Sequence, residues 1–341
     1  MIRFNKNLEL DKAFKNLILS MVNVNEYLTS VLNYNEMIIT PKKEKEVMLL
    51  FKKYNIPVNS LKYNSKILTE NPYYKNIKLN SISSNTVRYE KSIIKKRALM
   101  NMNFCKPLGK YLFHYDPIGY FDTDVEVTAL RENYTVWMSP AVSEIESMKD
   151  GIKKGHGKCL TMGLGIGVLP YLWLLKDDVQ SVTIIEINEN VIELFSKYIL
   201  PQFNTKKDVK IIHGNAFDYY NETFLEKFDY TYVDFWESNE DGLEFYTKLM
   251  EKNINFPNID YWIEDSILLN VKYIIVPYLN TIYEGKNIFD FISSLDPISR
   301  EIAKKANKYF KSKFNVITTE DELLSIIHNK RILRSILSFP L

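Results

Sequence analysis

The sequence predicts an α/β fold: a doubly wound, mostly parallel sheet that carries helices on both faces. Between residues 158 and 264, short apolar runs typical of buried strands alternate with amphipathic runs of helical spacing. This alternation favours parallel strands joined by crossover helices. The chain has 341 residues, 46% of them hydrophobic and 25% charged, a composition typical of a folded globular protein. At roughly 150 residues per domain, that length suggests about two domains.

Charge balance and cysteine usage limit the classes of partner. Basic residues number 44 and acidic residues 42, so the net charge of +2 draws the chain neither to nucleic acid nor to an anionic membrane. Cys105 and Cys159 lie far apart without zinc-binding spacing, so we expect no disulfide, no metal site and a reducing, cytoplasmic setting. The apolar runs are shorter than the roughly 20 residues that cross a bilayer. We expect a small-molecule substrate and no membrane, with nucleic acid the less favoured partner, because the lysine-rich stretches 91–97 and 304–313 are interpreted as solvated helix faces.

The N-terminal region is predicted to be helical at first and then to form a β-hairpin. Apolar residues recur at helical spacing over residues 10–22 and again over 47–54, so we expect the first hundred residues to be mostly helical. Alternating apolar residues over 125–129, a polar break at 131–133 and a second short run over 134–137 predict the hairpin.

A helix is expected to join this region to the sheet. Ser139 and Pro140 supply an N-cap and a first-turn proline, and Gly151 predicts the end of the helix. We therefore divide the chain into a helical and hairpin region (1–135), a nucleoside-binding unit (136–280) and a helical C-terminal extension (281–341).

The sheet is predicted from the alternation that follows. Strands are expected over residues 158–162, 181–186, 209–213 and 228–233, and helices over 167–176, 188–199, 219–227 and 241–252. The fifth strand is either 259–264 or 271–276, and we favour the earlier run because Glu264 would then begin a helix through Leu279. The last sixty residues are expected to be helical, with Thr318 or Thr319 as an N-cap.

A glycine-rich loop is the strongest functional signal. The chain has only 11 glycines, and Gly163, Gly165 and Gly167 alternate directly after the first predicted strand. Alternating glycines let the backbone turn sharply and approach a ligand where a β-carbon would intrude. This loop therefore predicts a ligand-binding site between the strand and the next helix.

Three further segments end consecutive predicted strands. Glu186 ends the second strand, about twenty residues after the loop, where a carboxylate can accept both hydroxyl protons of a ribose. Gly214-Asn215-Ala216 follows the third strand and Asp234 ends the fourth. Open α/β sheets bind ligands at the carboxyl ends of their strands, so we expect all four segments to meet.

Spacing narrows the ligand. A dinucleotide fingerprint needs a glycine where Val168 stands, and a phosphate-binding P-loop needs Ser or Thr after Gly-Lys, where Tyr111, Cys159 and Asn287 occur. The pattern thus favours a nucleoside that lacks pyrophosphate.

From about residue 137 to 264 the chain resembles the class I S-adenosylmethionine-dependent methyltransferases. The resemblance rests on Gly163-Leu164-Gly165-Ile166-Gly167, Glu186-Ile187, Gly214-Asn215-Ala216 and Val233-Asp234. Residues 182–192 resemble the spermidine synthase-like branch, which uses decarboxylated S-adenosylmethionine. The resemblance implies a Rossmann-like fold with S-adenosylmethionine as cofactor: the glycine loop would contact its methionine part, Glu186 its ribose and Asn215 its adenine amino group. The implied cofactor-binding residues are Gly163, Leu164, Gly165, Gly167, Glu186, Ile187, Asn215, Ala216 and Asp234.

Methyl transfer to an unidentified acceptor is the favoured function, with the hairpin region shaping the acceptor site. Asp234 is the candidate catalytic residue, as a base or an acceptor-orienting group, or else a helix cap. The alternative is aminopropyl transfer, for which Asp122, Asp124, Glu144, Asp234 and Glu237 are the candidate acids. The spermidine synthase-like branch usually carries an acid in the glycine loop, absent between Leu164 and Val168, so methyl transfer is preferred. A third alternative is a nucleoside-binding scaffold without turnover.

One further segment is not assigned to the site. Asn71-Pro72-Tyr73-Tyr74 resembles the Asn-Pro-Pro-Tyr motif of amino-group methyltransferases, but it lacks the second proline and precedes the predicted sheet. Phe235 and Trp236, which follow Asp234, are interpreted as packing residues or as a wall of the substrate pocket.

Overall fold

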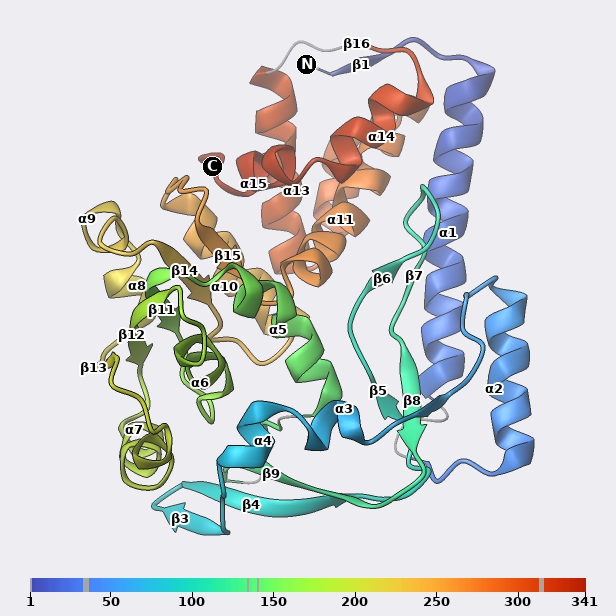
Figure 1. The fold of residues 1–341 in the computed structure, drawn as a ribbon. Helices are drawn as coiled ribbons and strands as arrows, with labels where there is room; N and C mark the ends of the chain where they lie inside the picture. Colours follow the sequence, from blue (N-terminus) through green and yellow to red (C-terminus); the bar gives the residue numbers. More distant parts are fainter. Residues whose placement is uncertain (1, 33–36, 134, 140, 313–315) are drawn as a thin grey trace.

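The computed structural model describes residues 2–32, 37–133, 135–139, 141–312 and 316–341 (Figure 1). These residues form a mixed α/β structure, as predicted. Two sheets are central to the site, one parallel and one antiparallel. Within the described ranges, no helix is both long enough and apolar enough to cross a membrane.

The parallel sheet has five strands. They are β11 (Gly157–Met162), β12 (Val179–Glu186), β13 (Asp208–His213), β14 (Tyr230–Val233) and β15 (Ile259–Tyr261), in the order β13-β12-β11-β14-β15. Every neighbouring pair is parallel, so the carboxyl ends of all five lie along one edge. The preferred position of the fifth strand is confirmed, because the rejected run 271–276 lies inside helix α11 (Glu264–Glu284).

The helices between these strands are mostly as predicted. They are α6 (Val168–Leu174), α7 (Glu189–Leu194) with a π-helical turn over Phe195–Ile199, α8 (Ala216–Tyr219), α9 (Glu222–Leu225) and α10 (Asn239–Glu251). The single helix expected over 219–227 is wrong. Asn215 and Asn221 each cap a separate short helix, which divides the segment into two.

The N-terminal region is less helical than expected. Helices α1 (Leu8–Leu32) and α2 (Pro41–Lys53) confirm the first two amphipathic runs. After them the chain forms two short helices and mainly strands: β2 (Lys62–Tyr63), α3 (Lys66–Thr69), α4 (Pro72–Asn76), β3 (Ile82–Ser84), β4 (Val87–Ile94), β5 (Met100–Asn101), β6 (Lys106–Pro107), β7 (His114–Tyr115) and β8 (Ile118–Phe121).

The antiparallel sheet lies beside α7 in Figure 1. Its order is β10-β9-β4-β3, where β9 (Val125–Glu132) and β10 (Thr135–Met138) form the predicted hairpin. Tyr134, where the second run was expected to begin, lies outside the described residues.

The helix expected over residues 91–97 is also wrong, because β4 runs through Ile94 and pairs with β9 along its whole length. Val87 and Tyr89 are buried on one face of β4, while exposed Lys91 pairs with Glu126 of β9 at 2.7 Å. The lysines suggested a solvated helix, but the alternation of buried residues and the partner strand decide the structure.

Helix α5 (Val142–Lys154) connects the hairpin to the parallel sheet. Its N-cap is Ala141 and not Ser139, and it continues past Gly151 to Lys154; Pro140 lies outside the described residues. A β-carbon at Gly151 would collide with the ring of Tyr232 on β14. Gly151 is therefore a close-packing position within the helix and not its end.

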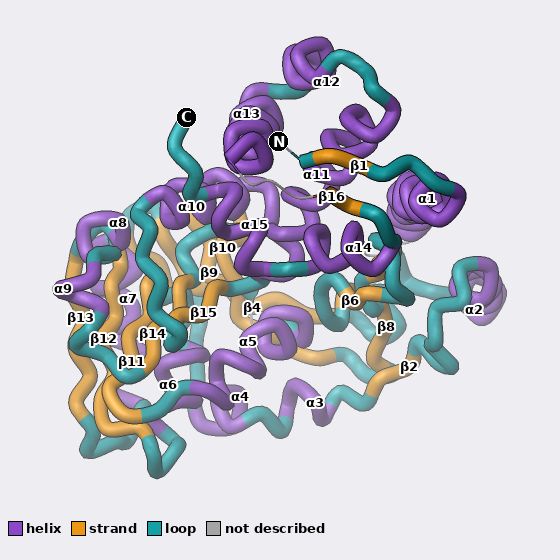
Figure 2. The backbone as a smooth tube through the Cα atoms, turned by 90° about the horizontal axis from the view of Figure 1, so that it is seen from above, coloured by secondary structure: helices purple, strands orange, loops and turns teal. Residues whose placement is uncertain are grey.

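The C-terminal extension packs beside α11 and α1 (Figure 2). It contains α12 (Ile288–Ser294), α13 (Pro297–Ser312), α14 (Glu320–His328) and α15 (Lys330–Leu337), and Thr319 caps α14 as predicted. A parallel pair between β1 (Arg3–Phe4) and β16 (Val316–Ile317) joins the N-terminal segment to the C-terminal extension. This pair was not predicted, because two-residue strands leave no periodic pattern.

Candidate functional site

A cavity of about 570 Å³ lies at the carboxyl ends of β11, β12 and β14. Its other walls come from the antiparallel sheet, through Leu130, Glu132 and Trp137, and from the first turn of α5, through Glu144. The volume is in the usual range for a small-molecule site. The hairpin region and the parallel sheet thus share one cavity.

The predicted site segments meet in this cavity. Of the nine cofactor-binding residues implied by the resemblance, all but one line it: Gly163, Leu164, Gly165, Glu186, Ile187, Asn215, Ala216 and Asp234. The exception is Gly167, which adopts a left-handed conformation as the N-cap of α6 and lies against the ring of Phe195.

The glycine loop is shaped by its contact with the end of β14. Gly163 has φ +107°, and a β-carbon there would collide with the backbone carbonyl of Asp234. Only glycine combines this dihedral angle with so close an approach. The loop and Asp234 are therefore held together by backbone packing.

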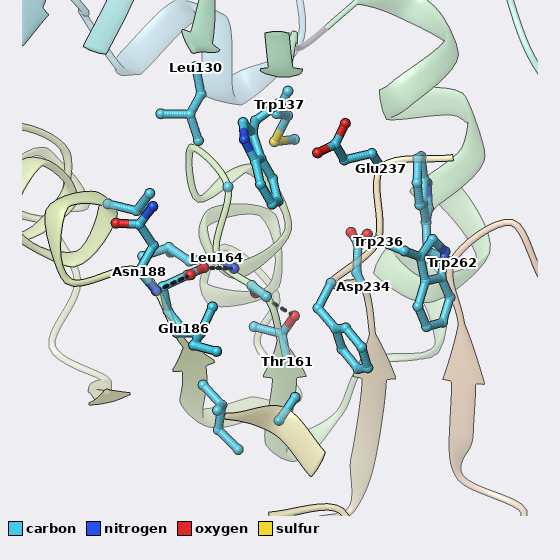
Figure 3. A pocket seen from close by; sticks show the side chains of 18 of the residues that line it. Leu130, Trp137, Thr161, Leu164, Glu186, Asn188, Asp234, Trp236, Glu237 and Trp262 are labelled. Carbon is cyan, nitrogen blue, oxygen red and sulfur yellow. Dashed lines mark hydrogen bonds between the residues drawn. The ribbon is translucent and has the colours of Figure 1, made fainter. Parts of the chain in front are cut away.

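Glu186 joins the second strand to the glycine loop. One carboxylate oxygen accepts the backbone N–H of Leu164 at 3.1 Å and the other accepts that of Asn188 at 2.8 Å (Figure 3). Burial raises the pKa of Glu186, and these N–H donors oppose that rise. Each carboxylate oxygen has a further lone pair, so the group can still accept hydroxyl protons from a ligand.

Asn215 has a local structural role as well as a place in the cavity wall. Its side-chain oxygen accepts the backbone N–H of Phe217 at 3.0 Å and so caps α8. The second lone pair of this oxygen remains for a ligand donor.

Six carboxylates line the cavity, and every charged side chain among the described lining residues belongs to this set: Glu132, Glu144, Glu186, Asp234, Glu237 and Asp241. Three of the five acids considered from the sequence are among them. Asp122 and Asp124 are elsewhere, where they pair with Lys62 at 2.6 Å and Lys95 at 3.2 Å. Sequence reasoning missed Glu132 and Asp241. The position of Glu132 at the turn of the predicted hairpin, which was expected to shape the acceptor site, could have indicated it.

Asp234 and Glu144 have the most strongly shifted carboxyl groups of the cavity. Burial raises the pKa of Asp234 to about 7. Burial, followed by the negative charge of Asp234, raises the pKa of Glu144 to about 8. Near neutral pH this wall of the cavity therefore holds a carboxyl pair that is partly protonated.

Aromatic side chains form much of the remaining wall. Trp137 comes from β10, Trp236 follows β14, and Trp262 follows β15. Trp262 donates through Nε1 to Ser147 of α5 at 2.8 Å, whereas the buried Nε1 of Trp236 has no partner among the described residues. Trp236 thus belongs to the cavity wall, one of the two interpretations given to it above.

The segment 71–74 contacts the site from outside. Asn71 caps α4, and Tyr73 is buried and donates its hydroxyl hydrogen bond to the carbonyl of Ile166 within the glycine loop. The sequence left this segment out of the site because it precedes the sheet. Tertiary packing brings it against the loop.

Comparison with known proteins gives structural matches only. No protein-family model matches the chain, and no curated protein matches it. The spermidine synthase from Thermotoga maritima is 17% identical with a TM-score of 0.28, over 36% of this chain and 48% of that one. A spermidine synthase in complex with the transition-state analogue AdoDATO is 19% identical with a TM-score of 0.27, over 37% and 48%. The match thus spans about half the length of each of these structures.

Proposed function

We propose that the chain is a transferase that takes an alkyl group from an adenosyl sulfonium donor and passes it to a small-molecule acceptor. One observation carries the proposal: the carboxylate of Glu186 lies at the end of β12, bonded to the glycine loop, and faces the same cavity as Asp234. A ribose-binding acid beside a loop without phosphate-binding residues suits a nucleoside lacking pyrophosphate.

The donor would lie along the strand ends. Gly163, Leu164 and Gly165 would contact its sulfonium arm, with Gly167 shaping the loop, and Glu186 and Ile187 its ribose. Asn215 and Ala216 would contact its adenine. The donor supplies an electrophilic carbon on a positively charged sulfur, so the protein contributes binding, orientation and removal of the acceptor's proton. We assign that last role to Asp234.

Methyl transfer from S-adenosylmethionine is the function expected from the sequence. A second candidate, aminopropyl transfer from the decarboxylated donor, is favoured by the six carboxylates of the cavity. Negative charge attracts a polycationic acceptor and repels the carboxylate that S-adenosylmethionine carries and its decarboxylated form lacks.

Thermal-shift titration with S-adenosylmethionine, its decarboxylated form and S-adenosylhomocysteine tests the proposal. A ligand that binds only the folded chain at a hundredfold excess over its Kd stabilises it by about 2.7 kcal/mol, a shift of several degrees. A larger shift with the decarboxylated donor supports aminopropyl transfer. No shift with any of the three refutes the proposal, and binding without transfer to a panel of amines supports a scaffold role.

Several wider expectations remain proposals. We propose a doubly wound arrangement of helices around the parallel sheet, the division at residues 135/136 and 280/281, a cytoplasmic location, and a small molecule as partner in preference to nucleic acid. The strand order β13-β12-β11-β14-β15 supports the first of these.

A further inference from the structure

Helix α5 carries one face toward the ends of β14 and β15. Gly151 packs on the ring of Tyr232 in β14, and one turn earlier Ser147 accepts the hydrogen bond of Trp262, which follows β15. Glu144 lies a further turn toward the start of the helix and lines the cavity. The spacing from 144 through 147 to 151 keeps these residues on one helical face. Along this face the helix contacts the sheet at Gly151 and reaches the cavity at Glu144.

Asp234 reaches the cavity from the neighbouring strand β14. It follows Tyr232 by two residues, about 7 Å along a strand, while Glu144 lies seven residues from Gly151, about 10 Å along a helix. Because Gly151 and Tyr232 are in contact, the two carboxyl groups reach the cavity on the same wall. In Figure 3 the carboxylate of Asp234 points into the cavity, across from Glu186.

Unlike Glu132, Glu186 and Asp241, the two carboxyl groups have no side-chain partner among the described residues; Glu237 shares this lack but is exposed. Glu186 accepts two backbone N–H groups, Glu132 accepts the side-chain amide of Asn188 at 3.0 Å, and Asp241 caps α10. Neither Glu144 nor Asp234 has a side-chain hydrogen bond or ion pair within the described part of the chain. Buried carboxylates without partners are costly, so the wall is suited to a proton or a cationic ligand.

We propose that Glu144 is a second catalytic residue, which forms with Asp234 a coupled carboxyl pair that takes the proton of an ammonium acceptor. This inference rests on the proposed transferase function and adds a residue to it. A carboxylate of the pair removes one proton from R–NH₃⁺, giving R–NH₂ and a carboxylic acid. The amine lone pair forms the N–C bond as the C–S bond breaks, and the electron pair of that bond goes to sulfur. The products are R–NH₂⁺–R′, a neutral thioether and the protonated pair, so the total charge of +1 is conserved.

Two neighbouring carboxyl groups suit this task because their negative charges oppose double ionisation, which keeps a proton shared near neutral pH. The other ionisable groups that face the pair are Tyr232 on β14 and the carboxylates of Glu132, Glu186, Glu237 and Asp241 around the cavity. All of these groups are acidic, so none of them supplies a positive charge that would lower the pKa of Glu144 or Asp234.

A direct test needs no substrate. Carboxyl groups of ¹³C-labelled Asp and Glu are followed by NMR during a pH titration of the wild type, Glu144→Gln and Asp234→Asn, each variant identifying its own signal. We expect both groups to titrate above pH 6 and Asp234→Asn to lower the midpoint of Glu144. The proposed pair is refuted if the two groups titrate with midpoints near pH 4. It is also refuted if the titration midpoint of Glu144 is the same in Asp234→Asn as in the wild type.

A second test measures transfer from S-adenosylmethionine or its decarboxylated form to 1,4-diaminobutane. We expect Glu144→Gln to lower kcat at least tenfold with donor affinity within threefold of wild type. The kcat of the double variant should be within threefold of the kcat of Asp234→Asn, because substitutions of residues that act as a unit do not have additive effects. The matched control is Glu146→Gln on the same helix, whose carboxylate pairs with Lys149 and lies outside the cavity lining.

The two tests fail differently. The catalytic role of Glu144 is refuted if Glu144→Gln retains the wild-type kcat. It is also refuted if the kcat loss of the double variant equals the product of the losses of the two single variants. If no donor binds the wild type, the proposed function fails, while the NMR titration still decides whether the pair exists.

Discussion

The hydroxyl of Tyr73, on a short helix of the N-terminal region, donates a hydrogen bond to the backbone carbonyl of Ile166 in the glycine loop. These residues are 93 positions apart. Asn76 of the same helix donates to the hydroxyl of Tyr171 on α6 at 2.8 Å. Helix α4 therefore braces both the loop and the helix that follows it.

Tyr73→Phe is expected to destabilise the chain and weaken donor binding. The substitution leaves the Ile166 carbonyl without its partner in a buried site, which costs about 1–3 kcal/mol. Urea denaturation measures the stability change and calorimetry the donor affinity. Tyr198→Phe is the control, because the half-buried Tyr198 hydroxyl has no hydrogen-bond partner among the described residues. Equal effects of the two substitutions would contradict the bracing role.

Gly163→Ala is expected to lower the free energy of unfolding by about 3 kcal/mol or more and to abolish donor binding. The new β-carbon meets the backbone carbonyl of Asp234 at a φ of +107°, so the loop and the strand end must separate. Gly109→Ala is the control: Gly109 also has positive φ, but no atom lies within 4 Å of a β-carbon there, so about 1 kcal/mol is expected. Denaturation curves that are the same for both variants would show that the close contact is unimportant.

Glu186→Gln should weaken the donor's affinity at least tenfold and lower stability by about 1–3 kcal/mol, because the amide NH₂ cannot accept one of the two backbone N–H groups that the carboxylate binds. A carboxylate accepts both ribose hydroxyl protons, whereas an amide offers one acceptor oxygen. Calorimetric titration measures this change. The neighbouring Glu189→Gln alters an exposed carboxylate outside the cavity lining and should bind the donor normally. Unchanged affinity in Glu186→Gln would remove this residue from the ribose site.

Glu144→Gln is expected to stabilise the chain at high pH and not at low pH. The pKa of Glu144 is raised to about 8, so between pH 4 and 8 the folded chain holds a proton that the unfolded chain releases, and stability falls as pH rises. Glutamine cannot ionise, so it avoids this loss. Each pKa unit corresponds to about 1.4 kcal/mol, so the rise from 4.5 to about 8 corresponds to a gain of about 5 kcal/mol at pH 9 and none at pH 4. A gain independent of pH would contradict the assignment.

Arg334→Gln is expected to cost about 2 kcal/mol of stability. Its guanidinium, 31% exposed, donates to Glu264, which is 10% exposed, at 2.8 Å. Removal leaves this buried carboxylate with the hydroxyl of Tyr246 at 2.5 Å and Lys330 at 3.4 Å, so its strongest charged partner is lost. Ile263, with φ +45°, joins Glu264 to Trp262, so tryptophan fluorescence should also change. Lys248→Gln removes an exposed pair and should cost less than about 0.5 kcal/mol. Similar losses in both variants would show that burial of the pair is irrelevant.

Local sequence patterns predicted the parallel sheet well. Each of its strands is a short apolar run bounded by polar or glycine residues, and the predicted ends at Met162, Glu186, His213 and Val233 agree with the structure. Parallel strands place their carboxyl ends on one edge, so Gly163, Glu186, Asn215 and Asp234 were expected to meet, and all four line the cavity. Here local chemistry and sheet geometry are sufficient.

Long-range contacts decided the rest. Gly151 lies within a helix because of the ring of Tyr232, and the lysine-rich residues after Tyr89 form a strand because β9 pairs with them. No local sequence pattern indicates which group lies next to each carboxylate in the folded chain. Glu144 joins Asp234, while Asp122 and Asp124 pair with surface lysines. The sequence alone determined the strand ends and the glycine loop, because these follow from local hydrophobic periodicity and backbone conformation. Only the tertiary structure decided the walls of the cavity, because burial and the charge of neighbouring groups depend on residues distant in the chain.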